Sequence, residues 1–302
     1  MYETFELTKR NIKVYLRDKA AVFFSFLSVI ILLGLYILFL GNNFKPNQLV
    51  GILTEQELNF LVYSQLLPGI MIINAVSIPL GNLGNIINDF EYRKLDGFLV
   101  APVKRGKVIL SYYLSSFLIT VVISIFMIIV AYVAIGLYTG IFFDIDVILL
   151  SILYVTLFAF VSTAIMIFVT SFIKSVNAFG AFSGVFGTVV GFISGIYMPL
   201  FILPSFIKGI ASLVPFTHMT IMLKQVMMKQ AFLMLDVKLQ PLMTEAEYQS
   251  FLTNYQEAVG YSSLDIFGLD VPFWLIAIVM GIISVVCLVL STYRLSNRIA
   301  KK

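Results

Sequence analysis

The chain has 302 residues, of which 60% are hydrophobic and only 12% are charged, and its formal net charge is +4. A soluble domain carries about 25% charged residues, so this composition excludes an ordinary soluble protein and indicates an integral membrane protein. A single cysteine and a single histidine exclude an intrachain disulfide and any metal site rich in either residue.

The first 19 residues are polar and basic. Phe5, Ile12, Leu16 and Ala20 fall near one face of a helix, which predicts an amphipathic helix in the lipid headgroup layer. Beyond it, apolar runs long enough to cross a bilayer predict transmembrane helices. There are six of these spans, at residues 20–40, 60–87, 108–138, 147–173, 176–198 and 271–293.

Two of the predicted spans carry small or polar residues at helical spacing. Asn82, Asn85 and Asn88 lie on roughly one side of the second span, where they either bond to a neighbouring helix or line a pathway. The fifth span has a glycine stripe that lets another helix approach closely, within this chain or from a second copy. The stripe consists of Gly180, Gly184, Gly187, Gly191 and Gly195.

The connection between the second and third spans, residues 88–107, is charged and patterned. Phe90, Lys94, Leu95 and Phe98 recur at helical spacing, and Pro102 ends the pattern. This spacing predicts a short amphipathic helix that contacts another protein. The alternative is an ordinary basic loop that follows the positive-inside rule.

A long segment, residues 199–269, separates the fifth and sixth spans. Pro199 and Pro204 break its apolar beginning into pieces too short to span, which predicts a half-inserted or interfacial helix. Thr244 and Glu247 have the spacing of a capping box before a helix that ends at Gly260. We therefore expect a small helical segment on the outer side of the membrane.

Charge fixes the expected orientation. If the N-terminus is inside, 15 of the 20 Lys and Arg residues and 6 of the 16 Asp and Glu residues face the cytoplasm. The positive-inside rule then predicts a multi-pass protein of the cell membrane with both termini cytoplasmic. No ionisable residue lies within the predicted spans, which argues against a proton-coupled carrier, whereas a sodium site made of backbone and hydroxyl oxygens stays open. The sequence has no G-x-x-x-x-G-K-[ST] loop, so energy from ATP would have to come from a partner.

The sequence EYRKLDGFLVAPVKR at residues 91–105 resembles the loop after the second span in permeases of the type-2 ABC exporter family. GIYMPL at residues 195–200, LVPF at residues 213–216 and the basic C-terminus are also similar to that family. The resemblance implies an all-α integral membrane fold that forms one permease domain over residues 1–302. Within it, residues 1–19 would be a connecting helix, residues 88–107 a coupling-helix loop and residues 199–269 an extracellular re-entrant and helical segment.

The resemblance also implies a function. The chain would be the non-catalytic membrane subunit of an ATP-driven exporter that moves a lipophilic or amphipathic substrate, such as a drug, a peptide antibiotic or a lipid. It would bind no cofactor itself, because ATP and Mg would sit on a separate ATPase subunit, expected in two copies. A second permease chain, identical or similar, and the lipid bilayer are the other expected partners, and nucleic acid is not. The alternatives are a membrane-embedded sensor or scaffold and a non-ABC carrier.

Three groups of site residues follow from this hypothesis. The glycine stripe would pack helices or join two copies. The substrate pathway would include Asn74, Ser77, Phe182, Phe186 and Phe192, for which core packing is the alternative role. The ATPase subunit would be contacted by Glu91, Tyr92, Arg93, Lys94, Leu95, Asp96, Gly97, Phe98, Leu99, Pro102, Val103 and Arg105.

Overall fold

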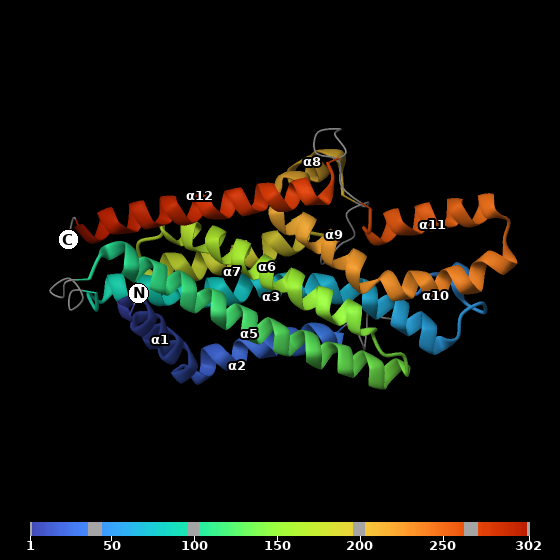
Figure 1. Ribbon diagram of the computed structural model, residues 1–302, viewed down its shortest axis with the longest axis horizontal. Coiled ribbons are helices and arrows are strands. Elements are labelled where there is room, and N and C mark those ends of the chain that lie inside the picture. The colour runs from blue at the N-terminus through green and yellow to red at the C-terminus, as the bar shows by residue number, and fades with distance from the viewer. Residues whose placement is uncertain (1, 36–43, 96–102, 196–202, 263–270, 301–302) are drawn as a thin grey trace.

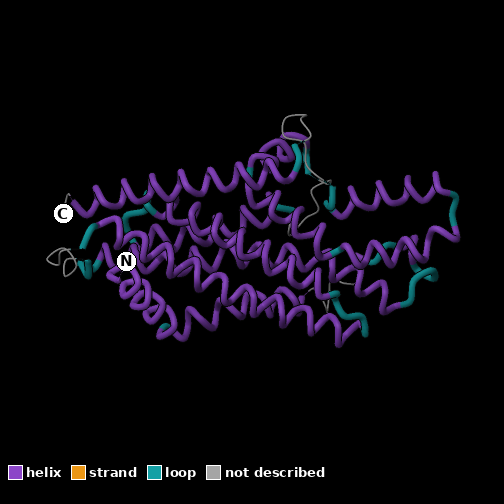
Figure 2. The backbone as a smooth tube through the Cα atoms, viewed as in Figure 1, coloured by secondary structure: helices purple, strands orange, loops and turns teal. Residues whose placement is uncertain are grey.

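The computed structural model describes the whole chain except residues 1, 36–43, 96–102, 196–202, 263–270 and 301–302. Its described part is helical and contains no strand (Figures 1 and 2). The α-helices are α1 (Tyr2–Arg17), α2 (Lys19–Leu35), α3 (Glu55–Glu91), α5 (Arg105–Thr139), α6 (Ile145–Thr170), α7 (Val176–Ile193), α8 (Ser205–Leu213), α9 (Pro215–Met227), α10 (Lys229–Leu239), α11 (Glu245–Val259) and α12 (Phe273–Ala300).

Helix α3 forms the centre of the bundle. It packs against α5, α6, α7 and α9, and 89% of its apolar stretch is buried within the chain. The corresponding value is only 17% for α7 and for α12, which leaves most of both helices uncovered. Since lipid is as apolar as a protein core, a membrane helix can expose such faces to the bilayer or to another chain.

Five described helices are long and apolar enough to cross a membrane, namely α3, α5, α6, α7 and α12. They correspond to the second to sixth predicted spans, although α3 extends beyond residues 60–87 at both ends. The predicted first span, residues 20–40, falls on α2, which is 17 residues long up to Leu35. Residues 36–40 of this predicted span lie outside the described part of the chain. The total of six spans therefore stays a prediction.

The segment after α7 is broken where its prolines predict a break. Helix α8 has only nine residues, and the chain bends by 87° before α9, which begins at Pro215. By length and composition, this bent pair could also form one broken span. Helices α10 and α11 continue past the far end of the bundle (Figure 1).

The capping box predicted at the start of α11 is confirmed. The Thr244 hydroxyl accepts a hydrogen bond from the Glu247 backbone N–H, and the Glu247 carboxylate accepts one from the Thr244 backbone N–H at 3.0 Å. Gly260 ends the helix with a left-handed φ of 66°, which favours glycine. The buried Lys224 ammonium of α9 donates to the Val259 carbonyl at 2.7 Å and so holds the end of α11 against the bundle.

Candidate functional site at the basic end

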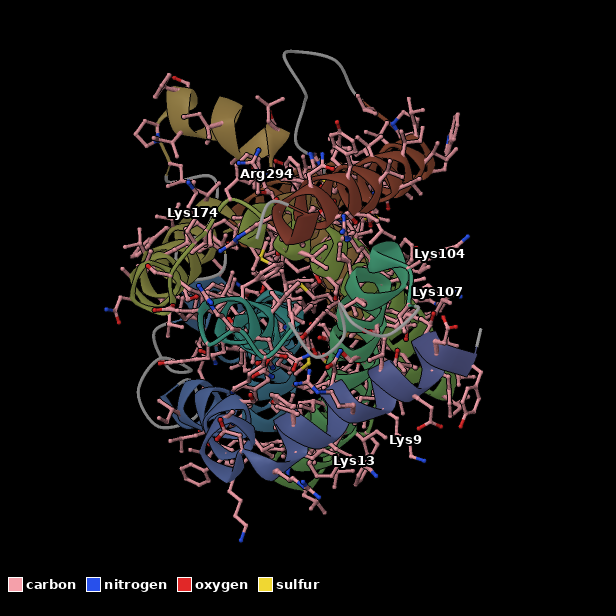
Figure 3. All side chains as sticks on the ribbon, turned by 90° about the vertical axis from the view of Figure 1, so that its left-hand side faces the viewer. Lys9, Lys13, Lys104, Lys107, Lys174 and Arg294 are labelled. Carbon is pink, nitrogen blue, oxygen red and sulfur yellow. The ribbon has the colours of Figure 1, made fainter. Side chains whose placement is uncertain are left out.

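Both chain termini lie at the same end of the bundle (Figure 1). Basic side chains from four separate parts of the chain gather there (Figure 3). We call this the basic end and define it by Lys9 and Lys13 of α1, Lys104 and Lys107 beside the start of α5, Lys174 between α6 and α7, and Arg294 of α12. A surface formed by so many segments can transmit a displacement to several helices at once.

Helix α3 ends at the basic end and leads into the segment predicted to contact a partner. Tyr92 is the C-cap, and Arg93 has a left-handed φ of 54°. The Lys94 backbone N–H donates to the Asp89 carbonyl at 3.0 Å, which is the bond of a Schellman motif. This stop turns the chain out of the helix, leaving Tyr92, Arg93 and Lys94 exposed while Leu95 is buried.

Only part of the predicted contact segment is described. Residues 91–95 form the helix end and turn, and Val103 and Arg105 lie just before and at the start of α5. The predicted amphipathic helix falls mainly on Asp96, Gly97, Phe98, Leu99 and Pro102, which lie outside the described residues. Of the described members, all except Leu95 and the half-buried Val103 are exposed.

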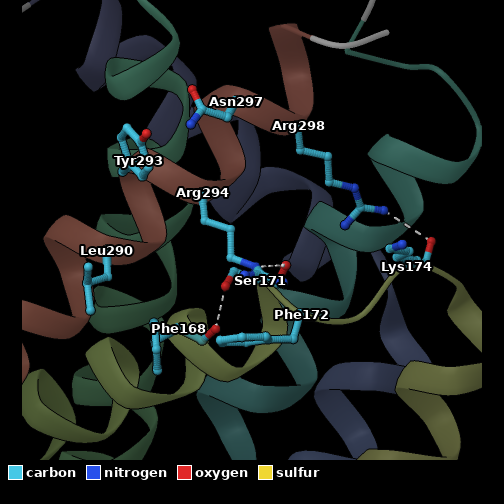
Figure 4. Close-up of a pocket in the computed structure, with 9 residues that line it drawn as sticks. All are labelled: Phe168, Ser171, Phe172, Lys174, Leu290, Tyr293, Arg294, Asn297 and Arg298. Atoms are coloured by element: carbon cyan, nitrogen blue, oxygen red, sulfur yellow. Dashed lines mark hydrogen bonds between the residues drawn. The ribbon is translucent and has the colours of Figure 1, made fainter.

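Contacts join the end of α3 to the α6–α7 turn and to α12. The Glu91 carboxylate accepts a hydrogen bond of 2.6 Å from the Val176 backbone N–H at the start of α7. The Arg298 guanidinium lies 4.5 Å from the Phe90 ring centroid. It also donates to the carbonyls of Ile173 at 2.7 Å and Lys174 at 3.1 Å (Figure 4). The predicted contact segment therefore begins beside α7 and α12.

A buried ionic cluster joins α1 to the same end of α3. Asp89 is 5% exposed, and its Oδ2 atom accepts hydrogen bonds from Arg10 at 2.6 Å and from the Tyr112 hydroxyl at 2.5 Å. Asn11 extends the contact by donating to Ser111 at 3.3 Å. Burial lowers the pKa of Arg10, but its bonds to Asp89 and Tyr112 outweigh that effect and raise the pKa overall. We call Arg10, Asn11, Asp89, Ser111 and Tyr112 the Arg10 cluster.

The sequence does not predict the Arg10 cluster, because Arg10 is one of several basic residues near the N-terminus and the predicted second span, residues 60–87, ends before Asp89. A signal was present nevertheless. Asp89 continues the helical stripe formed by Asn82 and Ile86, both of which are buried. An acidic residue on the buried stripe of a membrane helix needs a partner.

The residues predicted for a substrate pathway differ in how far the chain buries them. Asn74 is buried in α3, and its amide nitrogen has no hydrogen-bond partner among the described residues, whereas Ser77 is exposed. The Phe182 and Phe186 rings stack on each other with centroids 5.0 Å apart. Phe192 is 46% exposed. Their role in a common pathway therefore stays a prediction.

A cavity of about 210 Å³ at the basic end bears on the role of the asparagines. Asn85 and Asn88 line it, together with Tyr15 and Asp18 near the α1–α2 junction and Phe179 of α7. Asn82 does not line it and instead accepts a hydrogen bond from Asn85 at 3.3 Å. The geometry thus gives Asn82 a bonding role within α3 and places the other two at a cavity.

The glycine stripe divides into two parts. Gly180, Gly184 and Gly187 have no atom of the described chain within 4 Å of an added Cβ. Gly191 and Gly195 are buried instead, and Gly195 lies beyond the end of α7 with a φ of 71°. The prediction that all five share one face is therefore wrong, because the helix stops at Ile193. The close approach of α7 occurs at Gly84 of α3, where an added Cβ would lie 2.9 Å from the Phe179 ring.

Replacing Gly84 by Leu is expected to lower the free energy of unfolding of the purified chain by about 1–3 kcal/mol, because Phe179 and α7 must move to admit the side chain. Gly180→Leu is the matched control, since both changes favour helix formation and only the first creates a clash within the chain. Thermal unfolding in detergent measures both variants. Equal melting temperatures would contradict the close approach of α3 and α7.

Comparison with known proteins gives one family. A family model described as ABC-2 family transporter protein matches residues 53–293. A search of curated proteins finds no match. The matched residues include α3, the predicted contact segment and the first three quarters of α12.

Proposed function

The chain belongs to the ABC-2 family of transporter proteins and is a membrane permease subunit of an ABC transporter; we propose that it serves an exporter driven by a separate ATP-hydrolysing subunit. The cargo in this proposal is lipophilic or amphipathic, such as a drug, a peptide antibiotic or a lipid. The energy comes from ATP bound with Mg on the partner, because the sequence has no phosphate-binding loop of the G-x-x-x-x-G-K-[ST] type.

One observation supports this proposal above the others: the exposed turn at Tyr92–Lys94 directly follows the Arg10 cluster. Asp89 is fixed to α1 by Arg10 and to α5 by Tyr112, and Glu91 is bonded to the start of α7. A partner that pushes on this turn would therefore move α1, α3, α5 and α7 together. Rigid-body movement of packed elements is a common way to change conformation.

The proposed coupling works through the length of α3. This helix is unbroken for 37 residues from Glu55 to Glu91, so it can transmit movement from the basic end to the opposite end. ATP-driven closure of the partner subunits would displace the contact segment, residues 91–105. The α2, α3 and α7 helices would then rock between inward-open and outward-open arrangements, with both termini in the cytoplasm.

A second permease chain completes the proposed pathway. The uncovered faces of α7, with Gly180 and Gly184, allow close approach of another helix. Exposed apolar residues on the same helix, including Val185 and Val189, add surface for packing. Ser77 and Phe192, both exposed within one chain, would then face a cavity between two chains.

The test is purification of the chain from its own cell membranes in mild detergent, followed by measurement of Mg-dependent ATP hydrolysis. We expect an ATP-hydrolysing subunit to purify with the chain. Reconstituted in vesicles with its outer side facing the lumen, the complex should accumulate an amphipathic fluorescent dye when ATP is added outside. A chain that purifies without ATP hydrolysis under these conditions would contradict the proposal.

A further inference from the structure

An open groove of about 720 Å³ lies beside the contact segment but is separate from it. It runs between the α6–α7 turn and the end of α12 (Figure 4). The proposed coupling uses residues 91–105, and none of the described members of this segment lines the groove. Its lining residues are Phe168, Ser171, Phe172, Lys174, Leu290, Tyr293, Arg294, Asn297 and Arg298.

The charge of the groove has one sign. Lys174, Arg294 and Arg298 contribute three cations, and no carboxylate is among the described residues that line it. The Arg294 guanidinium lies 3.9 Å from the Phe172 ring centroid, and its Nε atom donates to the Ser171 carbonyl at 3.4 Å. These contacts orient the group without neutralising it, and a guanidinium carries further N–H donors for a ligand. The groove is thus suited to an anion.

The groove also has an apolar wall. Phe168, Phe172 and Leu290 lie on it, and Leu290 is 45% exposed. The same helix continues this wall along its uncovered face with Val286 and Val289. An anion that fits both parts must carry an apolar chain beside its charged group.

The position of the groove matches the boundary of a bilayer. The fourth and sixth predicted spans end at Ile173 and Tyr293, so the three cations lie at the level expected for headgroups. Aromatic rings such as Tyr293 are typical of this level, and basic pockets between membrane helices bind anionic headgroups there.

We propose that this groove binds an anionic phospholipid of the surrounding bilayer. Lys174 and Arg294 would hold the headgroup phosphate, and an acyl chain would lie along the exposed face of α12. The apolar wall continues along α12 at Val286 and Val289, which favours a lipid with a long acyl chain over an acidic peptide of a partner protein. The net charge of the groove favours phosphatidylglycerol over the zwitterionic phosphatidylcholine.

The test is native mass spectrometry of the purified chain from phosphatidylcholine micelles that contain increasing phosphatidylglycerol. The variant is Lys174→Gln with Arg294→Gln, and the control is Lys9→Gln with Lys13→Gln. The control also removes two positive charges from the basic end. These charges lie on α1, away from Lys174 and Arg294 (Figure 3). At about five-fold for each lost cation, the affinity for one phosphatidylglycerol should fall about thirty-fold in the variant. The control should retain the lipid.

Two further readouts make the result decisive. The melting temperature of the double variant in pure phosphatidylcholine micelles shows whether loss of the Arg294 contacts weakens the fold. The single variant Lys174→Gln changes an exposed side chain, so it should keep the fold. Its affinity for phosphatidylglycerol should still fall about five-fold. Equal phosphatidylglycerol binding by variant and control would overturn the proposal. So would a variant that keeps the lipid but loses the ATP-hydrolysing subunit, since the groove would then belong to the protein interface.

Discussion

Replacing Asp89 by Asn is expected to lower the free energy of unfolding by about 2 kcal/mol and to loosen α1 from the end of α3. One Asp89 oxygen accepts bonds from both Arg10 and Tyr112, and an uncharged amide cannot balance the guanidinium. Removing one partner of a fully buried ion pair costs about 3–5 kcal/mol. The expected value is smaller because the Arg10 side chain is 33% exposed and water screens its charge.

A double-mutant cycle in detergent measures this contact directly. Asp89→Asn, Arg10→Gln and the combined variant should give a coupling energy of about 2 kcal/mol. The control is the Glu3–Lys107 pair, which also joins α1 to α5 at 2.7 Å but whose carboxylate side chain is 41% exposed, against 7% for Asp89. Its cycle should show little coupling, because exposed ion pairs contribute little to stability. Additive effects at Asp89 and Arg10 would contradict the structural role of the cluster.

The same variant separates stability from transport. If the Arg10 cluster transmits movement from the contact segment, Asp89→Asn should still bind the ATP-hydrolysing subunit, because Tyr92 and Lys94 remain exposed. It should move at least about ten-fold less substrate for each ATP hydrolysed. Transport and hydrolysis that fall in parallel would instead indicate a purely structural role.

Charge reversal on the exposed turn is expected to have the largest effect on assembly. Lys94→Glu should weaken binding of the ATP-hydrolysing subunit at least ten-fold, since placing like charges opposite each other at an interface costs about 1.4 kcal/mol or more. The fold should survive because the Lys94 side chain is exposed, and its contact with the Tyr92 ring, 5.6 Å from the centroid, is a weak cation–π interaction.

Lys208→Glu is the matched control for this effect. Lys208 lies on α8, which is part of the segment expected on the outer side, so its reversal should not affect partner binding. Binding is measured as the amount of ATP-hydrolysing subunit that purifies with equal amounts of each permease variant. A similar loss in both variants would show that general charge, and not the contact segment, controls assembly.

Local signals in the sequence predicted local features of the fold correctly. Of the two prolines predicted to break the segment after α7, Pro199 lies outside the described residues, and Pro204 directly precedes the short helix α8, as expected from a residue that fixes φ and lacks an N–H. The capping box at Thr244 and Glu247 depends only on residues three apart and was also predicted. Long apolar runs likewise indicated membrane helices by length alone.

Features that depend on packing were not predictable in the same way. Arg10 and Asp89 are 79 residues apart, and only the fold brings them together. The sequence also does not determine whether the glycines of α7 face lipid or protein. Both surroundings are apolar, so the residues on the two faces of the helix do not differ in polarity. As a result, the sequence predicts close approach along the α7 stripe but not the contact that the structure shows between Gly84 of α3 and Phe179 of α7.

The proposed function requires that the turn after α3 meets the ATP-hydrolysing subunit. Cys287 is the only cysteine, so Cys287→Ser gives a background in which one new cysteine can carry a photoactivated cross-linker. Tyr92→Cys places it on the turn and Leu242→Cys on the opposite end, at sites that are 65% and 64% exposed. We predict that only Tyr92→Cys forms a cross-linked product with the ATP-hydrolysing subunit. A product from Leu242→Cys, or none from Tyr92→Cys in a complex that hydrolyses ATP, would contradict the account.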